Sequence, residues 1–230
     1  MLKNNNICII PARGGSKRIP KKNIKKFCGK PILSITIEIL KKSKLFKKII
    51  VSSDDLKILK IAKNLNVETH YRDKKLSNDY IGIIPVVKEV IKDYKKKGEK
   101  YKKVCCVFPT SIFFKKKNLL QALKKLEKNK SYIFTAAKYP HPIERSFTKI
   151  KNKLKMNFIK HFKSGTQTLP VSYYDAAQFY FGWEKSWLNE KNFFSGNNDF
   201  IELDPIYFQD IDEKEDWKKA IFKWKKFQKN

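Results

Sequence analysis

The sequence predicts an α/β protein with a doubly wound, mostly parallel sheet flanked by helices. Short apolar runs rich in β-branched residues alternate with longer amphipathic stretches along residues 1–137. The apolar runs lack a regular polar–apolar alternation, which is typical of strands buried on both faces of a parallel sheet. Ligands of such sheets bind at the carboxyl ends of the strands, so we expect the functional residues there.

Each element of this sheet is predicted from a local pattern. The apolar runs predicted to be strands are Ile7–Ile10, Ile49–Ser52, Val67–Tyr71, Val104–Phe108 and Tyr132–Ala137. The amphipathic stretches predicted to be helices are Pro31–Lys42, Asp54–Asn64, Gly82–Lys97 and Lys116–Lys128. Proline at the start of the first helix and acids at the start of the second are typical of helix N-termini.

The pattern changes at about residues 138–170. Tyr139-Pro-His-Pro142 interrupts the alternation, and only short segments such as Lys153–His161 follow. We therefore expect one domain over residues 1–230, with a small β-rich lobe inserted at 138–170. Such a lobe often serves as a dimerisation arm in folds of this kind, so we expect a homodimer.

Three further elements are predicted after this lobe. Ala176–Trp183 and Phe200–Leu203 are expected to be strands, and Asp212–Lys229 is expected to be the last helix. This helix begins with acidic residues and carries Trp217 and Trp224 on one face, which predicts packing against the core.

The net charge of +30 is not specific for nucleic acid. A basic nucleic-acid-binding module is the alternative function class, and it predicts arginine, lysine and aromatic residues gathered on one face. Here lysine is spread along the whole chain, and only four of the 52 basic residues are arginine. We therefore expect neither nucleic-acid nor membrane binding, and each arginine becomes a candidate for phosphate or carboxylate recognition.

The sequence also predicts a cytoplasmic protein. No apolar run approaches the roughly 18 residues of a membrane-spanning helix, and the N-terminal run is too short for a signal peptide. The four cysteines show no Cys-x-x-Cys spacing, so we expect buried thiols in a reducing compartment.

The segment Ile7–Asn23 joins a buried strand to a basic loop. It reads Ile-Cys-Ile-Ile-Pro-Ala-Arg-Gly-Gly-Ser-Lys-Arg-Ile-Pro-Lys-Lys-Asn. Glycine allows close approach of the backbone to a ligand, and positive charge at the carboxyl end of a strand suits a polyphosphate. The Gly-x-Gly-x-x-Gly and P-loop motifs are absent. We predict that this loop, including Gly14, binds a polyphosphate through backbone amides and basic side chains.

Two acids near the C-terminus form a second candidate site. Asp210 and Asp212 flank Ile211 and would point to the same side of a strand. Two carboxylates can share a Mg²⁺ ion, whose shell is completed by water and phosphate oxygens. The alternative is that Asp212 only caps the last helix. The basic loop favours the metal site, because nucleoside triphosphates bind together with Mg²⁺.

Polar residues in two other segments are candidate ligands for a small molecule. Thr110 and Ser111 place hydroxyl groups after the fourth predicted strand, although such residues also cap turns. Asp175, Gln178 and Tyr180 lie among aromatic residues, and buried Asp and Gln side chains need hydrogen-bond partners. A polyhydroxylated ligand would supply these partners.

The order of these motifs resembles that of the acylneuraminate cytidylyltransferases, the CMP-sialic acid synthetase family. Besides the basic loop, the matching motifs are Val51-Ser-Ser-Asp-Asp55, Arg72…Leu76-x-x-Asp79, Pro109-Thr-Ser111 and Asp210-Ile-Asp212…Asp-Trp217. They extend over nearly the whole chain. Val104-Cys-Cys-Val, Tyr174-Asp-Ala-Ala-Gln-Phe-Tyr180 and His141-Pro-Ile-Glu-Arg145 are most similar to the pseudaminic acid cytidylyltransferase branch.

The resemblance implies a Rossmann-like nucleotidyltransferase that depends on Mg²⁺. In the implied reaction, the anomeric hydroxyl of a nine-carbon 3-deoxy-ulosonic acid attacks the α-phosphorus of CTP, and pyrophosphate leaves. The residues implied to be catalytic are Arg13, Lys22, Asp210 and Asp212, with both aspartates as metal ligands. Those implied to bind CTP are Ala12, Arg13, Gly14, Ser16, Lys17, Lys22, Asn23, Arg72 and Asp79. Those implied to bind the sugar are Thr110, Ser111, Arg145, Asp175, Gln178 and Tyr180.

The resemblance favours pseudaminic acid as the sugar, with N-acetylneuraminic or legionaminic acid as the alternative. Phe108 stands where sialic acid synthetases usually have glutamine, which argues against N-acetylneuraminic acid. Gly165 stands where arginine is common, which predicts a different role for the inserted lobe.

Overall fold

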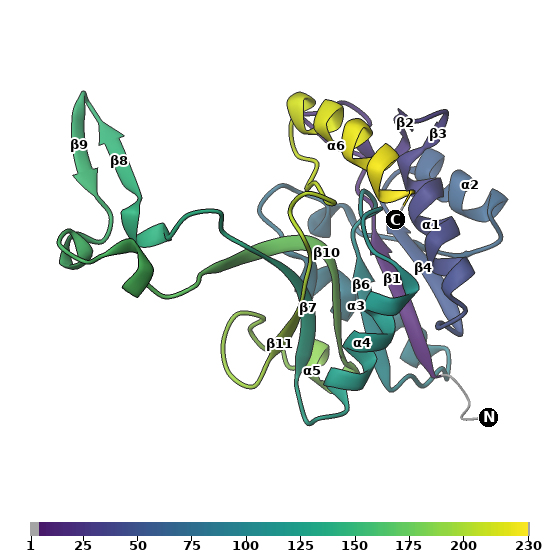
Figure 1. The fold of residues 1–230 in the computed structure, drawn as a ribbon. Helices are drawn as coiled ribbons and strands as arrows, with labels where there is room; N and C mark the ends of the chain where they lie inside the picture. Colours follow the sequence, from purple (N-terminus) through teal and green to yellow (C-terminus); the bar gives the residue numbers. More distant parts are fainter. Residues whose placement is uncertain (1–4, 230) are drawn as a thin grey trace.

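A seven-stranded sheet forms the centre of the protein, in the order β11-β7-β10-β6-β1-β4-β5 (Figure 1). The structure is a computed structural model that describes residues 5–229. The strands are β1 (Asn6–Pro11), β4 (Lys48–Ser53), β5 (Glu68–Tyr71), β6 (Lys103–Val107), β7 (Tyr132–Lys138), β10 (Tyr173–Trp183) and β11 (Asp199–Glu202). The predicted doubly wound sheet is confirmed, and all the predicted strands are present.

Most of the sheet is parallel, and its winding reverses beside β1. β1 pairs in parallel with β4 on one side and with β6 on the other, whereas β10 is antiparallel to both β6 and β7. The chain therefore leaves the carboxyl ends of β1 and β6 in opposite directions. Such a switch point opens a crevice at the edge of a sheet, where ligands bind in folds of this type.

Helices cover both faces of the sheet (Figure 1). One face packs against α1 (Ile32–Ser43), α2 (Leu56–Asn64), α4 (Lys116–Leu126) and α6 (Lys214–Phe227). The other face packs against α3 (Ile83–Lys96) and the short α5 (Glu184–Leu188), which was not predicted. Among residues 5–229, no helix is both long and apolar enough to span a bilayer.

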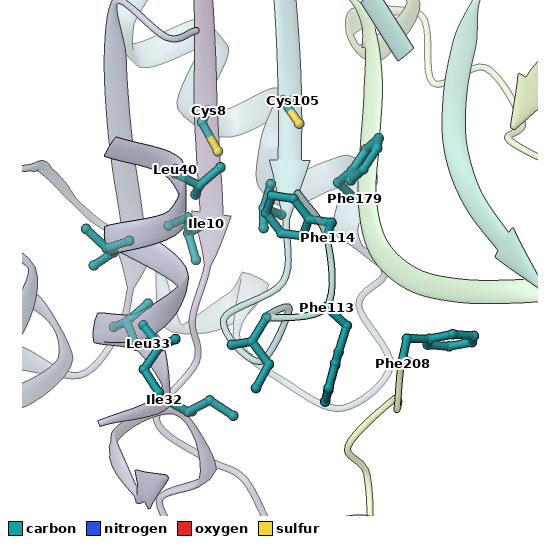
Figure 2. Close-up of a cluster of buried hydrophobic side chains, with 14 of the residues drawn as sticks. Cys8, Ile10, Ile32, Leu33, Leu40, Cys105, Phe113, Phe114, Phe179 and Phe208 are labelled. Atoms are coloured by element: carbon teal, nitrogen blue, oxygen red, sulfur yellow. The ribbon is translucent and has the colours of Figure 1, made fainter. Parts of the chain in front are cut away.

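The helices on both faces of the sheet explain why the strands are continuous apolar runs. Cys8 and Ile10 point into the core on the α1 side, and Ile7 and Ile9 point into the core on the α3 side. All four side chains are fully buried. Figure 2 shows the α1-side core around them, in which Phe113 follows β6. Burial on both faces removes the polar positions that a half-exposed strand would need.

Several details differ from the sequence predictions. A two-stranded hairpin, β2 (Lys26–Phe27) and β3 (Lys30–Pro31), precedes α1 and exposes Cys28, so one of the expected buried thiols is at the surface. Asp210 and Asp212 lie in a loop rather than in a strand. The last helix begins at Lys214, after the predicted start.

Residues 139–172 lie between β7 and β10 and project away from the sheet (Figure 1). This segment contains a hairpin of β8 (Phe147–Ile150) and β9 (Lys153–Met156) and three 3-10 turns, η3 (Ile143–Arg145), η4 (Ile159–His161) and η5 (Thr166–Thr168). Both strands are mostly exposed, because the hairpin packs against no other strand or helix layer.

Candidate active site

A cavity of about 490 Å³ opens at the carboxyl ends of β1 and β6, where the sheet reverses its winding. The basic loop, the segment after β5, the N-terminus of α3 and the loop before α6 all contribute to its walls. The residues of the predicted site that line it are Arg13, Ser16, Lys17, Lys22, Asn23, Arg72, Asp79, Thr110 and Asp212. The structure therefore brings together residues that lie up to about 200 positions apart in the sequence.

Positive charge in the basic loop points into this cavity. Arg13 Nη1 lies 2.5 Å from Asp79 Oδ1, and Lys17 Nζ lies 2.7 Å from Asp79 Oδ2. Asn23 is buried and donates from Nδ2 to the carbonyl oxygen of Arg13 at 2.8 Å. Asn23 thus holds the loop in shape, so its side chain acts on the cavity through the backbone of Arg13.

Two backbone amides at the start of the loop are used within the protein. Ala12 N–H donates to the carbonyl of Ser52, and Gly14 N–H donates to Asp54 Oδ1 at 2.9 Å. A Cβ atom on Gly14 would lie 2.8 Å from Cβ of Asp55, so glycine is needed here for contact with the protein itself. The amides of Ala12 and Gly14 are therefore already bonded within the protein, whereas the basic side chains of Arg13, Lys17 and Lys22 line the cavity.

Arg72 is the most deeply buried cation of the cavity, with a residue exposure of 3%. Its Nη2 donates to the Ser52 carbonyl at 2.8 Å, and its Nε atom has no partner. Within residues 5–229, no carboxylate forms an ion pair with it, and burial lowers its pKa although Asp54 and Glu89 oppose this effect. A buried guanidinium without an ion-pair partner indicates a site for an anion.

A series of hydrogen bonds through Ser52, His70 and Asp93 fixes the residue that accepts from Arg72. His70 Nδ1 lies 3.1 Å from Ser52 Oγ, and His70 Nε2 lies 3.1 Å from Asp93 Oδ2 on α3. The Ser52 carbonyl accepts from both Arg72 and Ala12, so it links the basic loop to β5. His70 therefore has a structural role, as its isolated position in the sequence suggests.

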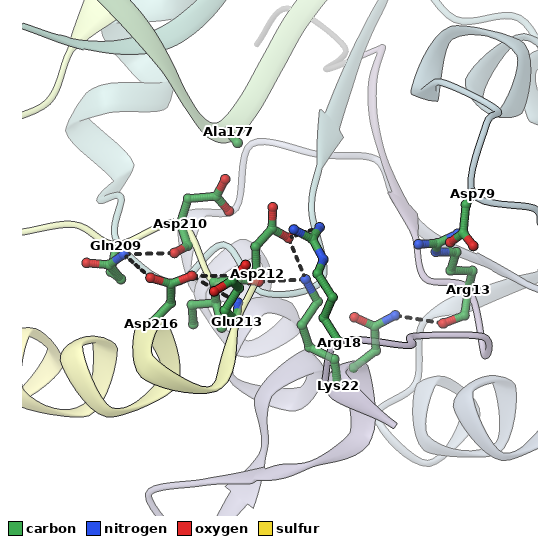
Figure 3. A network of polar contacts seen from close by, with 12 residues as sticks. Arg13, Arg18, Lys22, Asp79, Ala177, Gln209, Asp210, Asp212, Glu213 and Asp216 are labelled. Carbon is green, nitrogen blue, oxygen red and sulfur yellow. Dashed lines mark hydrogen bonds and ion pairs between the residues drawn. The ribbon is translucent and has the colours of Figure 1, made fainter. Parts of the chain in front are cut away.

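Asp212 faces the basic loop across the cavity (Figure 3). Its Oδ1 lies 3.0 Å from Arg18 Nη2 and 3.1 Å from Lys22 Nζ. Burial raises the pKa of Asp212, but Lys22 and Arg18 outweigh this effect and hold it below its usual value. Asp216 accepts the backbone N–H groups of Asp212 and Glu213 at the start of α6. The side chain of Asp212 is therefore not the helix cap.

Asp210 lies beside Asp212 in the same loop, and its carboxylate points toward Ala177 of β10 (Figure 3). Although this side chain reaches solvent, loss of hydration and the negative charge of Asp212 raise its pKa to about 6. A positive charge between the two carboxylates would relieve this repulsion. The loop before α6 thus carries two acidic side chains whose pKa values shift in opposite directions, and Asp212 is the one that lines the cavity.

A second, smaller cavity of about 270 Å³ lies near Asp175, between β7, β10 and β11. Half of its lining residues are aromatic, and they include Phe134, Phe193 and Phe194. Tyr180 packs 4.6 Å from Phe193 between ring centroids and 5.9 Å from Phe108, which lines the first cavity. The two cavities are therefore separated by one cluster of aromatic rings.

Asp175 is one of two acidic residues that line this second cavity, and the other is Asp199. Asp175 accepts a short hydrogen bond from the hydroxyl of Tyr180 and one of 2.9 Å from Ala177 N–H. Burial raises the pKa of Asp175, although these two hydrogen bonds oppose the shift. Burial also raises the pKa of Tyr180, and the Tyr180 hydroxyl remains a donor to Asp175.

Four residues of the predicted sugar site line neither cavity: Ser111, Arg145, Gln178 and Tyr180. The Ser111 hydroxyl donates to the Ala177 carbonyl. Gln178 is 1% exposed, and its amide bonds the backbone of Phe113 and Ala176. Arg145 lies in the projecting segment, where it donates to the carbonyls of Phe162 and Ser164. Within one chain, these residues are structural.

The sequence prediction missed the aromatic wall of the second cavity. Phe193 and Phe194 follow α5 in a loop rich in Ser, Gly and Asn, which carries no motif. Phe194 is 64% exposed. Two adjacent aromatic residues in a polar loop are the one local signal of a binding surface there.

Comparison with known proteins decides the family. The model of the cytidylyltransferase family matches residues 7–216, which is nearly the whole chain. The chain belongs to the cytidylyltransferase family. The resemblance described from the sequence motifs is thereby confirmed.

Relatives of this cytidylyltransferase match most of its length. The pseudaminic acid cytidylyltransferase of Campylobacter jejuni is 40% identical over 214 residues, which covers 92% of each chain. The N-acylneuraminate cytidylyltransferase of Escherichia coli is 27% identical and covers 94% of this chain and 51% of that protein. The solved CMP:2-keto-3-deoxy-manno-octonic acid synthetase complexed with CTP has the same fold, with a TM-score of 0.70 at 11% identity over 98% of this chain and 99% of the other.

Proposed function

We propose that the protein transfers CMP from CTP to pseudaminic acid and releases pyrophosphate. The observation that carries this proposal is one cavity that combines Arg13, Lys22 and Arg72 with the carboxylate of Asp212. Its walls supply positive charge for a triphosphate, and the Campylobacter jejuni relative named for pseudaminic acid is 40% identical over 92% of the chain. Phosphoryl-type transfer needs positioning and charge neutralisation rather than a protein nucleophile.

In the proposed reaction, the anomeric oxygen of the sugar forms a bond to the α-phosphorus of CTP. The bond between the α-phosphorus and the bridging β-oxygen breaks, pyrophosphate leaves with the electron pair, and the hydroxyl proton is released. Arg13, Lys17, Lys22 and Arg72 hold the polyphosphate in the first cavity. Their charge stabilises the negative charge that builds up on the leaving group.

Asp210 and Asp212 fit a Mg²⁺ ion. In residues 5–229, no group of three or more His, Cys, Asp or Glu side chains could hold a metal ion. Mg²⁺ commonly uses one or two carboxylates and completes its shell with water and substrate phosphates, so this pair is sufficient. The mutual repulsion that raises the pKa of Asp210 supports a cation at this place. When bound, Mg²⁺ would neutralise charge on the α-phosphate.

The second cavity suits the sugar. Aromatic faces pack against the apolar surfaces of a sugar ring and its acyl groups, and Asp175, which accepts from the buried Tyr180 hydroxyl, offers a hydrogen-bonding group. Thr110 lines the first cavity near its junction with the aromatic cluster. We place the apolar part of the acceptor sugar in this second cavity, with its carboxylate and anomeric hydroxyl extending past the aromatic cluster toward Asp210 and the first cavity.

A panel of sugars tests the proposed function. The protein is incubated with CTP, Mg²⁺ and, separately, pseudaminic, legionaminic and N-acetylneuraminic acid, and pyrophosphate release and product mass are measured. We expect the mass of a CMP-sugar with pseudaminic acid and much slower release with the other two. A faster reaction with either of the others would replace the proposed sugar, and no release with any sugar would refute the proposed activity.

Activity should depend on pH and Mg²⁺ together. Asp210 has a pKa of about 6, so it loses its charge, and with it part of the metal site, as the pH falls through 6. At limiting Mg²⁺, kcat/KM for CTP should fall below this pH, and the midpoint should move lower as Mg²⁺ is raised, because metal and proton compete. A midpoint that does not respond to Mg²⁺ would contradict the role of Asp210.

We also propose that the protein is a homodimer joined through residues 139–172. This segment exposes large apolar side chains on its hairpin and on the turn after it, including Leu154 (68%), Ile159 (72%) and Phe162 (65%). An exposed apolar patch of this kind is typical of a protein–protein interface, and a second copy of the segment offers a matching apolar surface. The nucleotide substrate and the three buried thiols support a cytoplasmic location.

Replacing Leu154 and Ile159 together by aspartate should convert the dimer to a monomer in sedimentation velocity. Two buried charges without partners cost far more than a dimer contact of this size gains. The matched control is Leu56→Asp on α2, where the leucine is 71% exposed on the body of the protein. If the double variant stays dimeric, or the wild type is a monomer, the proposed interface is refuted.

A further inference from the structure

The carboxylate of Asp79 occupies a place in the first cavity where an anionic ligand would also meet two cations. Its two carboxylate oxygens contact two different cations, Arg13 at 2.5 Å and Lys17 at 2.7 Å. Hydrogen bonds from Lys17 and Arg13 hold the pKa of Asp79 below its usual value, so its charge is present under all ordinary conditions. These are the same cations that we assign to the polyphosphate of CTP.

The segment that carries Asp79 is a turn between η2 (Lys74–Leu76) and α3. Tyr80 beside it is 97% exposed, and Asn78 bonds only to Tyr80 and Lys75 within the same segment. The ion pairs of Asp79 are therefore what joins this turn to the basic loop. The turn can move away without breaking packed contacts of Tyr80.

We propose that Asp79 is a built-in competitor of the polyphosphate, which leaves Arg13 and Lys17 when CTP binds and returns when pyrophosphate departs. A carboxylate that stayed in place would meet the negative charge of the triphosphate at close range, which is strongly unfavourable. Because the Asp79 carboxylate is part of the chain, its effective concentration at the two cations is high. An anion with a single phosphate therefore gains little binding free energy by displacing it. A polyphosphate makes enough new charged contacts to do so.

This competition makes Asp79 a residue that determines anion specificity. It would reject inorganic phosphate and would assist the release of pyrophosphate by taking back the two cations. The preference for CTP over smaller anions rests on the proposed function. Competition between Asp79 and pyrophosphate can be measured whether or not the proposed function is correct.

Asp79→Asn tests the proposal, because it removes the charge and keeps the shape. We expect the Kd of pyrophosphate, measured by calorimetry, to fall at least about tenfold, and inorganic phosphate to become a measurable ligand. The Kd of CTP should fall as well. Asp79→Glu retains the charge and should bind pyrophosphate as weakly as the wild type, which shows that the folded site is intact.

The control is Asp73→Asn, six residues earlier, where the aspartate accepts from Lys75 N–H outside the cavity. It should leave pyrophosphate binding unchanged. Weaker or unchanged pyrophosphate binding in a folded Asp79→Asn protein would overturn the proposal, because Asp79 would then be a ligand or a bystander. Failure of the wild type to bind CTP would instead refute the proposed function and leave the pyrophosphate comparison valid.

Discussion

Asp212→Asn is expected to lower turnover by about a thousandfold, which corresponds to about 4 kcal/mol of transition-state stabilisation. The asparagine keeps the shape of the side chain but loses the charge that we assign to Mg²⁺ binding. It also leaves Arg18 and Lys22 without their carboxylate partner. Turnover measured against Mg²⁺ concentration should show a large increase in the concentration that gives half the maximal rate.

Asp216→Asn is the matched control for this prediction. Asp216 accepts the N–H groups of Asp212 and Glu213, so its loss should weaken the start of α6 and lower the thermal stability. Its magnesium titration should remain close to that of the wild type. If Asp212→Asn shows a normal magnesium titration and only a lower melting temperature, its carboxylate is structural and the assigned metal site is wrong.

Arg13→Lys is expected to lower kcat/KM for CTP by well over tenfold although the charge is preserved. The guanidinium presents a planar pair of donors that can grip one phosphate with two hydrogen bonds, whereas an ammonium group cannot. Arg13 is positioned by the Asn23 bond to its carbonyl, so a shorter or differently shaped side chain cannot move to compensate.

Steady-state kinetics with CTP as the varied substrate measures this effect. Lys26→Arg, at the exposed position of β2, is an exchange between the same residue types outside the cavity and should leave the kinetics unchanged. Equal kcat/KM values for wild type and Arg13→Lys would remove the Arg13 guanidinium from the reaction.

The fold was predictable because its signals are local. The run Ile7–Ile10 is apolar at every position, which indicates burial on both faces, and the structure shows these residues fully buried between two helix layers. The spacing of Trp217 and Trp224 likewise predicted the inner face of α6. Each of these patterns reports on a single element and needs no knowledge of its neighbours.

The site was predictable only in part, because partners from other strands decide the role of each group. The sequence cannot show that Asp54 accepts a hydrogen bond from Gly14 N–H, or that Gln178 Oε1 accepts one from Phe113 N–H. Ala177 has a left-handed backbone, with φ of 48°, inside β10, and the irregular pairing there turns Gln178 inward. The loop with Phe193 lines the second cavity, although it lies far along the chain from the other site residues and carries no sequence motif.

Anomalous diffraction from a crystal grown with CTP and Mn²⁺ tests the central claim most directly. We expect a manganese peak at bonding distance from carboxylate oxygens of Asp210 and Asp212 and from an α-phosphate oxygen, with the triphosphate on Arg13 and Lys22. Manganese bound to the triphosphate away from both aspartates, or CTP bound outside the cavity, would contradict this account.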